Sequence, residues 1–238
     1  MLKQAHAISE ELIEWRRDFH MHPETGFDVY RTAGIVADEL EKMGYRVKRG
    51  IGKTGIVADI GEGGKMVAIR ADMDALPLQE LNESEFKSLV DGKMHACGHD
   101  SHTAMALGAA HILAKEKLNG RVRFLFQPSE ESADEEGKSG AVRMSEEGAM
   151  EGVDYVIAQH VDPGQPLGTI AITRRSWALA SSGCLGRSLA AALYIAPALV
   201  SSVLRTTHST SSVPPPRPPP DGRLPVDAAP MLPSPPLP

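Results

Sequence analysis

The sequence predicts an α/β domain, in which a mixed, mostly parallel sheet is flanked by helices. Helical and strand patterns alternate along residues 1–182, and this order is typical of α/β folds. The helical segments have apolar residues at a spacing of three and four, whereas the strand segments are short apolar runs bounded by turn residues. With 42% apolar and 24% charged residues, the chain has the composition of a globular protein.

Four segments carry the pattern of helices. The first is expected to end before Pro23, and its apolar face carries Ile8, Leu12, Trp15 and Phe19. The others are expected over residues 32–43, 103–118 and 141–147. Gly44 is the expected C-terminal cap of the second helix, and Asp100 or Ser101 is the expected N-cap of the third.

Five segments carry the pattern of strands. They cover residues 55–60, 66–71, 121–126, 155–159 and 167–172. The glycine-rich turn at residues 61–64 predicts that the first two strands form a hairpin.

Polar side chains stand at the ends of these predicted elements. In open α/β sheets the carboxyl ends of the strands converge on one functional crevice, so residues at these positions are expected to meet there. They are Asp72 and Asp74 after strand 66–71, Glu130 and Glu131 after strand 121–126, His160 after strand 155–159, and Cys97, His99 and Asp100 before helix 103–118.

The side chains expected at this crevice are of metal-ligand types. Cys97 and His99 offer a thiolate and an imidazole two residues apart, and the glycine between them lets the backbone turn. In the Glu130–Glu131 pair, one carboxylate can bind metal while the other accepts a proton from water. Together with His160, this mixture of nitrogen, oxygen and sulfur ligands suits Zn²⁺ and also admits Mn²⁺, Co²⁺ or Ni²⁺.

Each feature also has a plain structural interpretation. Cys97 and His99 alone could be an incidental pair, and adjacent glutamates usually form a solvated surface. His160 could be a hydrogen-bonded core histidine, and aspartates after a strand often cap a turn. Because all of these features occur together at successive element ends, the sequence favours a metal-dependent hydrolase.

Composition indicates which partners and which cellular location are expected for the chain. A formal net charge of −6 argues against a nucleic-acid-binding protein. Cys97 and Cys184 are too few for a disulfide framework, so a reduced, cytoplasmic location is expected, and the first residues carry no apolar signal segment. The apolar run at residues 189–204 is interrupted by Pro197 and is shorter than the roughly 20 residues that a membrane span needs.

Several blocks of the sequence resemble one known family of metalloenzymes. The two longest are RADMDALP at residues 70–77 and MHACGHDSHTA at residues 94–104. Shorter ones are WRRDFHMHPE at 15–24, TGIV at 54–57, FQPSEE at 126–131 and AQH at 158–160. Over about residues 8–182 the chain resembles the amidohydrolase branch of the aminoacylase and carboxypeptidase G dinuclear metallopeptidases. That branch includes hippurate hydrolases, N-acyl-amino-acid amidohydrolases and auxin-conjugate hydrolases.

The resemblance implies a role for each matching residue. It makes Glu130 the general base and acid, and Asp74 the aspartate that supports a metal-binding histidine from behind. His22 and His102 match motif positions and are expected to be supporting or structural. The implied ligands of two divalent metal ions are Cys97, His99, Glu131 and His160.

The resemblance also implies a zinc-peptidase-like catalytic domain and an activity. The expected reaction cleaves the amide bond of N-acyl amino acids, hippurate-like or N-acetyl, to a carboxylic acid and an amino acid. Family members carry a ferredoxin-like lid that also forms a dimer, and a further metal-binding histidine after it. Because the resemblance ends near Gly183, residues 1–182 are expected to be the N-terminal part of the catalytic domain. Without the lid, turnover is expected to be impaired and the family-type homodimer is not expected.

Residues 183–238 have a different composition, rich first in alanine and leucine and then in proline. They are expected to be a low-complexity, disordered tail. A frame shift in a GC-rich coding sequence would produce such a composition. The proline run at residues 214–220 could instead be a polyproline ligand, which would make the chain an interaction protein on an inactive enzyme scaffold. For the chain as a whole, this interaction protein and a metal-binding remnant without catalysis are therefore the two alternatives to an impaired amidohydrolase.

Overall fold

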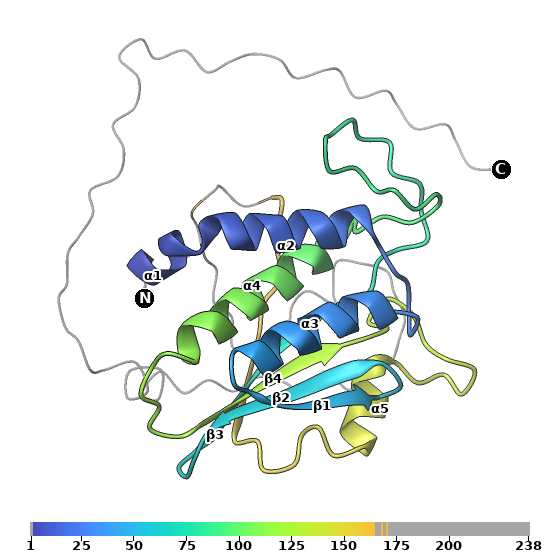
Figure 1. Ribbon diagram of the computed structural model, residues 1–238. Helices are drawn as coiled ribbons and strands as arrows, with labels where there is room; N and C mark the ends of the chain where they lie inside the picture. The colour runs from blue at the N-terminus through green and yellow to red at the C-terminus, as the bar shows by residue number, and fades with distance from the viewer. Residues whose placement is uncertain (1, 165–167, 169, 171–238) are drawn as a thin grey trace. The chain divides into compact units, whose positions relative to one another are not determined.

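The computed structural model describes residues 2–164 together with residues 168 and 170 (Figure 1). In this part, the helices are α1 (Leu2–Ala7), α2 (Ser9–Met21), α3 (Tyr30–Lys42), α4 (His99–Leu113) and α5 (Gly140–Glu146). The strands are β1 (Arg46–Ile51), β2 (Gly55–Gly61), β3 (Met66–Asp72), β4 (Arg121–Gln127) and β5 (Tyr155–Ala158).

The five described strands form one sheet in the order β1-β2-β4-β3-β5. The pairs β3–β4 and β3–β5 are parallel, whereas β1–β2 and β2–β4 are antiparallel. Four of these strands therefore point the same way, and β2 alone is reversed. The predicted mixed, mostly parallel sheet flanked by helices is confirmed.

The sheet is covered on both faces. On one face, α3 and α4 pack against the strands and α2 packs on α4 (Figure 1). Phe124 and Phe126 on β4 point into this larger core together with Leu40 of α3 and Leu107 of α4. Leu125, between the two phenylalanines, belongs to a smaller core with Met144 of α5. This alternation follows from the two-residue period of a strand.

The end of α3 is a glycine cap, as the sequence predicts. Gly44 has a φ of +88° and donates its N–H to the carbonyl of Glu41, while Tyr45 N–H donates to Leu40. This double hydrogen bond is a Schellman motif, which needs a left-handed residue that glycine provides most easily. The buried Tyr45 then donates its hydroxyl to the carbonyl of Ala110, so the cap connects α3 to α4.

The predicted hairpin between β2 and β3 is wrong, because β4 lies between these strands. The pairing places Gly61 opposite Arg121 of β4 and pairs Met66 of β3 with the same residue. The glycine-rich turn reverses the chain but leaves room for another strand. β4 is buried along nearly its whole length, and pairing on both edges satisfies its backbone groups.

Other boundaries also differ from those expected. Strand β1 was not predicted, because it is an edge strand whose residues are mostly exposed and it has no apolar run. Helix α4 begins at His99 rather than near residue 103 and ends at Leu113 rather than at residue 118. Its N-cap is Gly98, not Asp100 or Ser101. The strand expected at residues 167–172 and the tail from residue 183 lie outside the described residues, apart from residues 168 and 170.

Among the described residues, no helix is both long enough and apolar enough to cross a membrane.

The position of β4 predicts unequal effects of two alanine substitutions. Gly61 and Gly63 both have positive φ, but a Cβ on Gly61 would lie 2.3 Å from the carbonyl oxygen of Gly120, whereas one on Gly63 meets nothing. We expect Gly61→Ala to lower the free energy of unfolding by about 1–3 kcal/mol more than Gly63→Ala does, because only the first is overpacked. Urea unfolding measures both. Equal losses would contradict the insertion of β4.

Candidate metal centre

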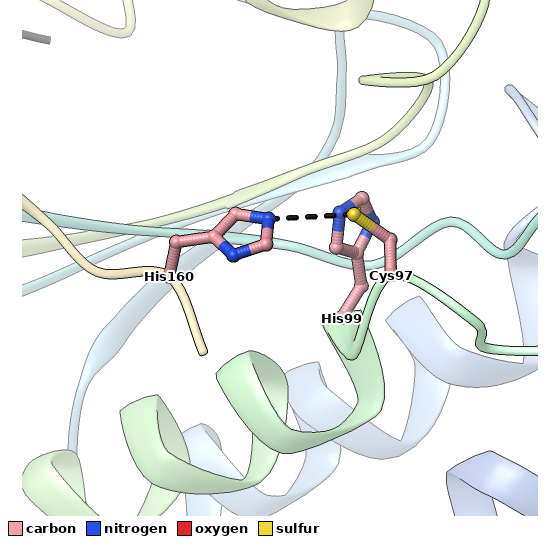
Figure 2. A group of neighbouring side chains, drawn as sticks. All are labelled: Cys97, His99 and His160. Atoms are coloured by element: carbon pink, nitrogen blue, oxygen red, sulfur yellow. Dashed lines mark hydrogen bonds between the residues drawn. The ribbon is translucent and has the colours of Figure 1, made fainter. Parts of the chain in front are cut away.

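The carboxyl ends of β3, β4 and β5 meet the beginning of α4 at one place. The six residues with implied roles lie together there: Asp74, Cys97, His99, Glu130, Glu131 and His160. Of the other two residues expected at this crevice, Asp72 lies beside them, whereas Asp100 is paired with His20 and Arg16 instead. Around the Nε2 atom of His99, the nearest carboxylate oxygens of Glu131 and Glu130 are 3.7 and 3.9 Å away. The Sγ of Cys97 is 3.3 Å from Nε2 of His160, and both side chains face His99 (Figure 2).

His99 lies at the centre of this cluster with one nitrogen engaged and one free. Its Nδ1 donates to the backbone carbonyl of Asp74 at 2.7 Å, so Nε2 is the nitrogen that carries the lone pair when the ring is neutral, as it is in a metal ligand. Nε2 is buried and has no hydrogen-bond partner among the described residues. Buried polar atoms are nearly always satisfied, and a lone pair facing carboxylates is suited to a cation.

Three sets of side chains bring their ligand atoms within 4.8 Å of one another. His99 belongs to each set, and the donor types are those that bind divalent transition metals. The sets are Cys97, His99 and His160; His99, Glu130 and Glu131; and Asp72, His99 and His102.

Asp74 organises both sides of the cluster. Its backbone carbonyl orients His99, and its carboxylate accepts the backbone N–H groups of Glu130 and Glu131 at 3.0 and 3.1 Å. Ser129, before the glutamates, has a φ of +44°, so the chain turns sharply after β4. One aspartate thus positions a histidine of α4 and the glutamate pair of the β4 loop.

Residues 68–229 match the peptidase family M20/M25/M40. The chain belongs to this family. The match includes every residue of the cluster, and the family expected from the sequence blocks is confirmed.

Curated relatives are similar to this chain over about two thirds of its length. Thermostable carboxypeptidase 2 of Saccharolobus solfataricus is 46% identical over 169 residues, covering 69% of this chain and 42% of that protein. IAA-amino acid hydrolase ILR1-like 6 of Arabidopsis thaliana is 50% identical over 158 residues, covering 65% and 33%. The chain thus spans less than half the length of these curated relatives.

A solved structure of the same family shares the fold. The Bacillus subtilis protein YXEP, a dinuclear metal binding peptidase from the M20 family, has a TM-score of 0.66 and 40% sequence identity. The similarity covers 71% of this chain and 47% of YXEP.

Neighbouring charges shift the pKa values of the cluster in opposite directions. Burial raises the pKa of Glu130, and the charge of Asp72 adds to this shift. Burial would also raise the pKa of Asp72, but Arg70 and His102 hold it well below its usual range. Asp72 therefore stays ionised while Glu130 is the better proton acceptor and donor.

The two predicted histidine ligands both sit where positive charge is favoured. Burial alone lowers the pKa of His99, but its contacts with Asp74 and Cys97 outweigh burial and raise the pKa to about 11. The contact with Cys97 is the main cause that raises the pKa of His160 to about 9. A bound divalent cation would replace these protons as the positive charge.

A buried hydrogen-bonded pair beside the cluster was not predicted from the sequence. Asp72 and His102 are both fully buried, and His102 Nδ1 donates to Asp72 Oδ1 at 2.6 Å. The available signal was the motif itself, since His102 is three residues after His99 on α4 and Asp72 is two residues before Asp74. His22, also expected to be supporting, donates its Nδ1–H to the carbonyl of Asp18 and is in none of the three sets.

The pKa of Asp72 predicts a pH dependence of folding. A carboxyl whose folded pKa is depressed stabilises the fold above its unfolded pKa, near 3.8, and this contribution is lost as the pH falls below that value. The free energy of unfolding should therefore drop more steeply between about pH 5 and pH 2 in the parent chain than in Asp72→Asn. Urea unfolding at several pH values measures both slopes, and equal slopes would contradict the assignment.

Proposed function

We propose that this chain is the metal-binding part of an amidohydrolase that holds two divalent cations and cleaves N-acyl amino acids. The observation that carries the proposal is the buried Nε2 of His99, which has no hydrogen-bond partner in the part of the chain that the structure describes and lies close to a thiolate, an imidazole and two glutamates. Among protein sites, this combination of donors is typical of catalytic transition-metal centres.

The proposed ligands are Cys97, His99, Glu131 and His160. Thiolate and imidazole ligands favour Zn²⁺, carboxylates also suit Mn²⁺, and Co²⁺ or Ni²⁺ are compatible with the same donors. Support for two cations comes from YXEP, a dinuclear metal binding peptidase that is 40% identical. Because Cys97 is a free, half-buried thiol that must stay reduced to bind metal, we place the activity in the cytoplasm.

The proposed roles divide the glutamate pair. Divalent cations supply Lewis acidity, which polarises an amide carbonyl and acidifies water. Glu130 accepts the proton of the attacking water and returns it to the leaving amine nitrogen, and its raised pKa suits both transfers. Asp74 keeps Glu130 and Glu131 in place through their backbone N–H groups, so the base does not depend on a flexible loop.

The proposed substrates are small N-acyl amino acids, hippurate-like or N-acetyl, which give a carboxylic acid and an amino acid. Support comes from the named activities of the relatives, an IAA-amino acid hydrolase at 50% identity and a carboxypeptidase at 46%. Both names describe the cleavage of an amide bond next to an amino acid. A formal net charge of −6 argues against nucleic acid as the substrate.

The two glutamates predict different consequences of the same substitution. Glu130→Gln keeps the side chain's shape but cannot accept a proton, so hydrolysis of hippurate or N-acetyl amino acids should fall at least about 100-fold. Its metal content should stay close to that of the parent chain. Glu131→Gln should lose metal as well as activity, because an uncharged amide replaces a carboxylate that binds the metal directly. Metal analysis after gel filtration and a turnover assay on the same samples measure both.

The outcomes separate the alternatives. Equal loss of metal in both variants would show that the glutamate roles are assigned the wrong way round. A parent chain that binds metal but hydrolyses none of these substrates would be a metal-binding remnant. A parent chain that binds no divalent metal would overturn the proposed function.

A further inference from the structure

The residue after His160 is held to α4 from two sides. Val161 donates its backbone N–H to Nε2 of His102 at 2.9 Å. Its side chain packs directly on Gly98, since a Cβ on Gly98 would lie 2.4 Å from Cγ2 of Val161. Gly98 also has a φ of +87°, so both its conformation and its close contact with Val161 favour glycine. The segment after β5 is thus clamped to the start of α4.

His102 is restricted to one tautomer. A backbone N–H can only donate, so the Nε2 that faces Val161 carries a lone pair and Nδ1 carries the hydrogen. That hydrogen is donated to Asp72 at 2.6 Å. Asp72 is itself held by Arg70 and by Thr103, whose hydroxyl donates to its backbone carbonyl at 2.9 Å. The His102 ring therefore cannot turn without breaking hydrogen bonds in a buried site.

This arrangement excludes His102 as a metal ligand, although it lies within one of the three ligand sets. Both of its nitrogens are occupied, one by the Asp72 carboxylate and one by Val161 N–H. Within the described residues, His99 differs in this respect, because its Nε2 has no hydrogen-bond partner.

The carbonyl of Val161 orients the neighbouring imidazole. Nδ1 of His160 donates to this carbonyl at 2.7 Å, so Nε2, which lies 3.3 Å from Sγ of Cys97, is the nitrogen that carries the lone pair when the ring is neutral. His160 is exposed and would otherwise be free to rotate. Both backbone polar groups of Val161 are thus engaged, the N–H by His102 and the C=O by His160.

We infer that His102 is a positioning residue, which aims Nε2 of His160 at the metal centre by holding the backbone of Val161. The inference rests on the proposed metal centre. It assigns a purpose to a fully buried histidine that the proposed chemistry does not use. Hydrogen-bonded groups behind metal ligands commonly set metal affinity, and their loss typically weakens it by about 10–100-fold.

Two substitutions of His102 separate its two hydrogen bonds. The amide of glutamine reaches about as far as Nε2 and can still accept the N–H of Val161. The amide of asparagine reaches about as far as Nδ1, so it can donate to Asp72 but leaves Val161 N–H without an acceptor. The two variants are matched in polarity and differ in the bond that they keep.

The test measures Zn²⁺ affinity of the 238-residue chain by competition with a chromophoric chelator. His102→Asn should weaken Zn²⁺ binding by about 10–100-fold, whereas His102→Gln should stay much closer to the parent chain. Amide hydrogen exchange of Val161 should become faster in the asparagine variant and not in the glutamine variant. Equal Zn²⁺ affinity in both variants and the parent, or a greater loss with glutamine, would overturn the inference.

Cys97→Ser is the control for the metal centre itself. If it binds Zn²⁺ as well as the parent chain does, the proposed centre is wrong and the inference is overturned with it. If it loses affinity while His102→Asn does not, only the positioning role is overturned.

A second pair of variants covers the case in which His102→Asn does not fold. Val161→Pro removes the N–H that donates to His102, and Val161→Ala keeps it, while neither keeps the branched side chain that packs on Gly98. We expect weaker Zn²⁺ binding in the proline variant than in the alanine variant. Equal binding in the two would overturn the inference.

Discussion

The hydrogen bond from Nδ1 of His99 to the carbonyl of Asp74 is the interaction on which the whole centre depends. It leaves the lone pair on Nε2, at a buried point that the neighbouring carboxylates face. The same aspartate holds the backbone of Glu130 and Glu131 with its carboxylate. A displacement of Asp74 would therefore misplace groups from both α4 and the β4 loop. This coupling explains how one short loop after β3 organises these two other segments.

The direction of the strands makes this convergence possible. β3, β4 and β5 run parallel, so the loops that follow them emerge on one edge, and each brings its own polar residue. The reversed strand β2 contributes none of the candidate ligands. Gly98 completes the arrangement, because its left-handed conformation lets α4 begin at His99, and this places Cys97 and His99 opposite the strand ends.

The sequence predicted that the candidate residues lie together and that the sheet is mixed and mostly parallel, but it did not predict the order of the strands. The candidate ligands each directly follow or precede an element, so their convergence required only correct element types. The hairpin prediction failed because the glycines at residues 61–64 describe a local turn, whereas the insertion of β4 depends on pairing with residues 55 positions away or more. The contact between His102 and Val161 could not be predicted either, because it joins a side chain to a backbone N–H that is 59 residues away in the sequence. No side-chain pattern records such a bond.

The charges of the centre explain why its geometry needs so many hydrogen bonds. Asp72, Asp74, Glu130 and Glu131 surround His99, and carboxylates this close repel one another unless donors or cations neutralise them. Each buried aspartate is accordingly given donors, Arg70 and His102 for Asp72 and two backbone N–H groups for Asp74. The glutamates receive no such donors to their side chains among the described residues, and Nε2 of His99 stays unpartnered. The part of the centre left unsatisfied is therefore the part that faces the proposed cations, so binding them also relieves the repulsion that folding creates.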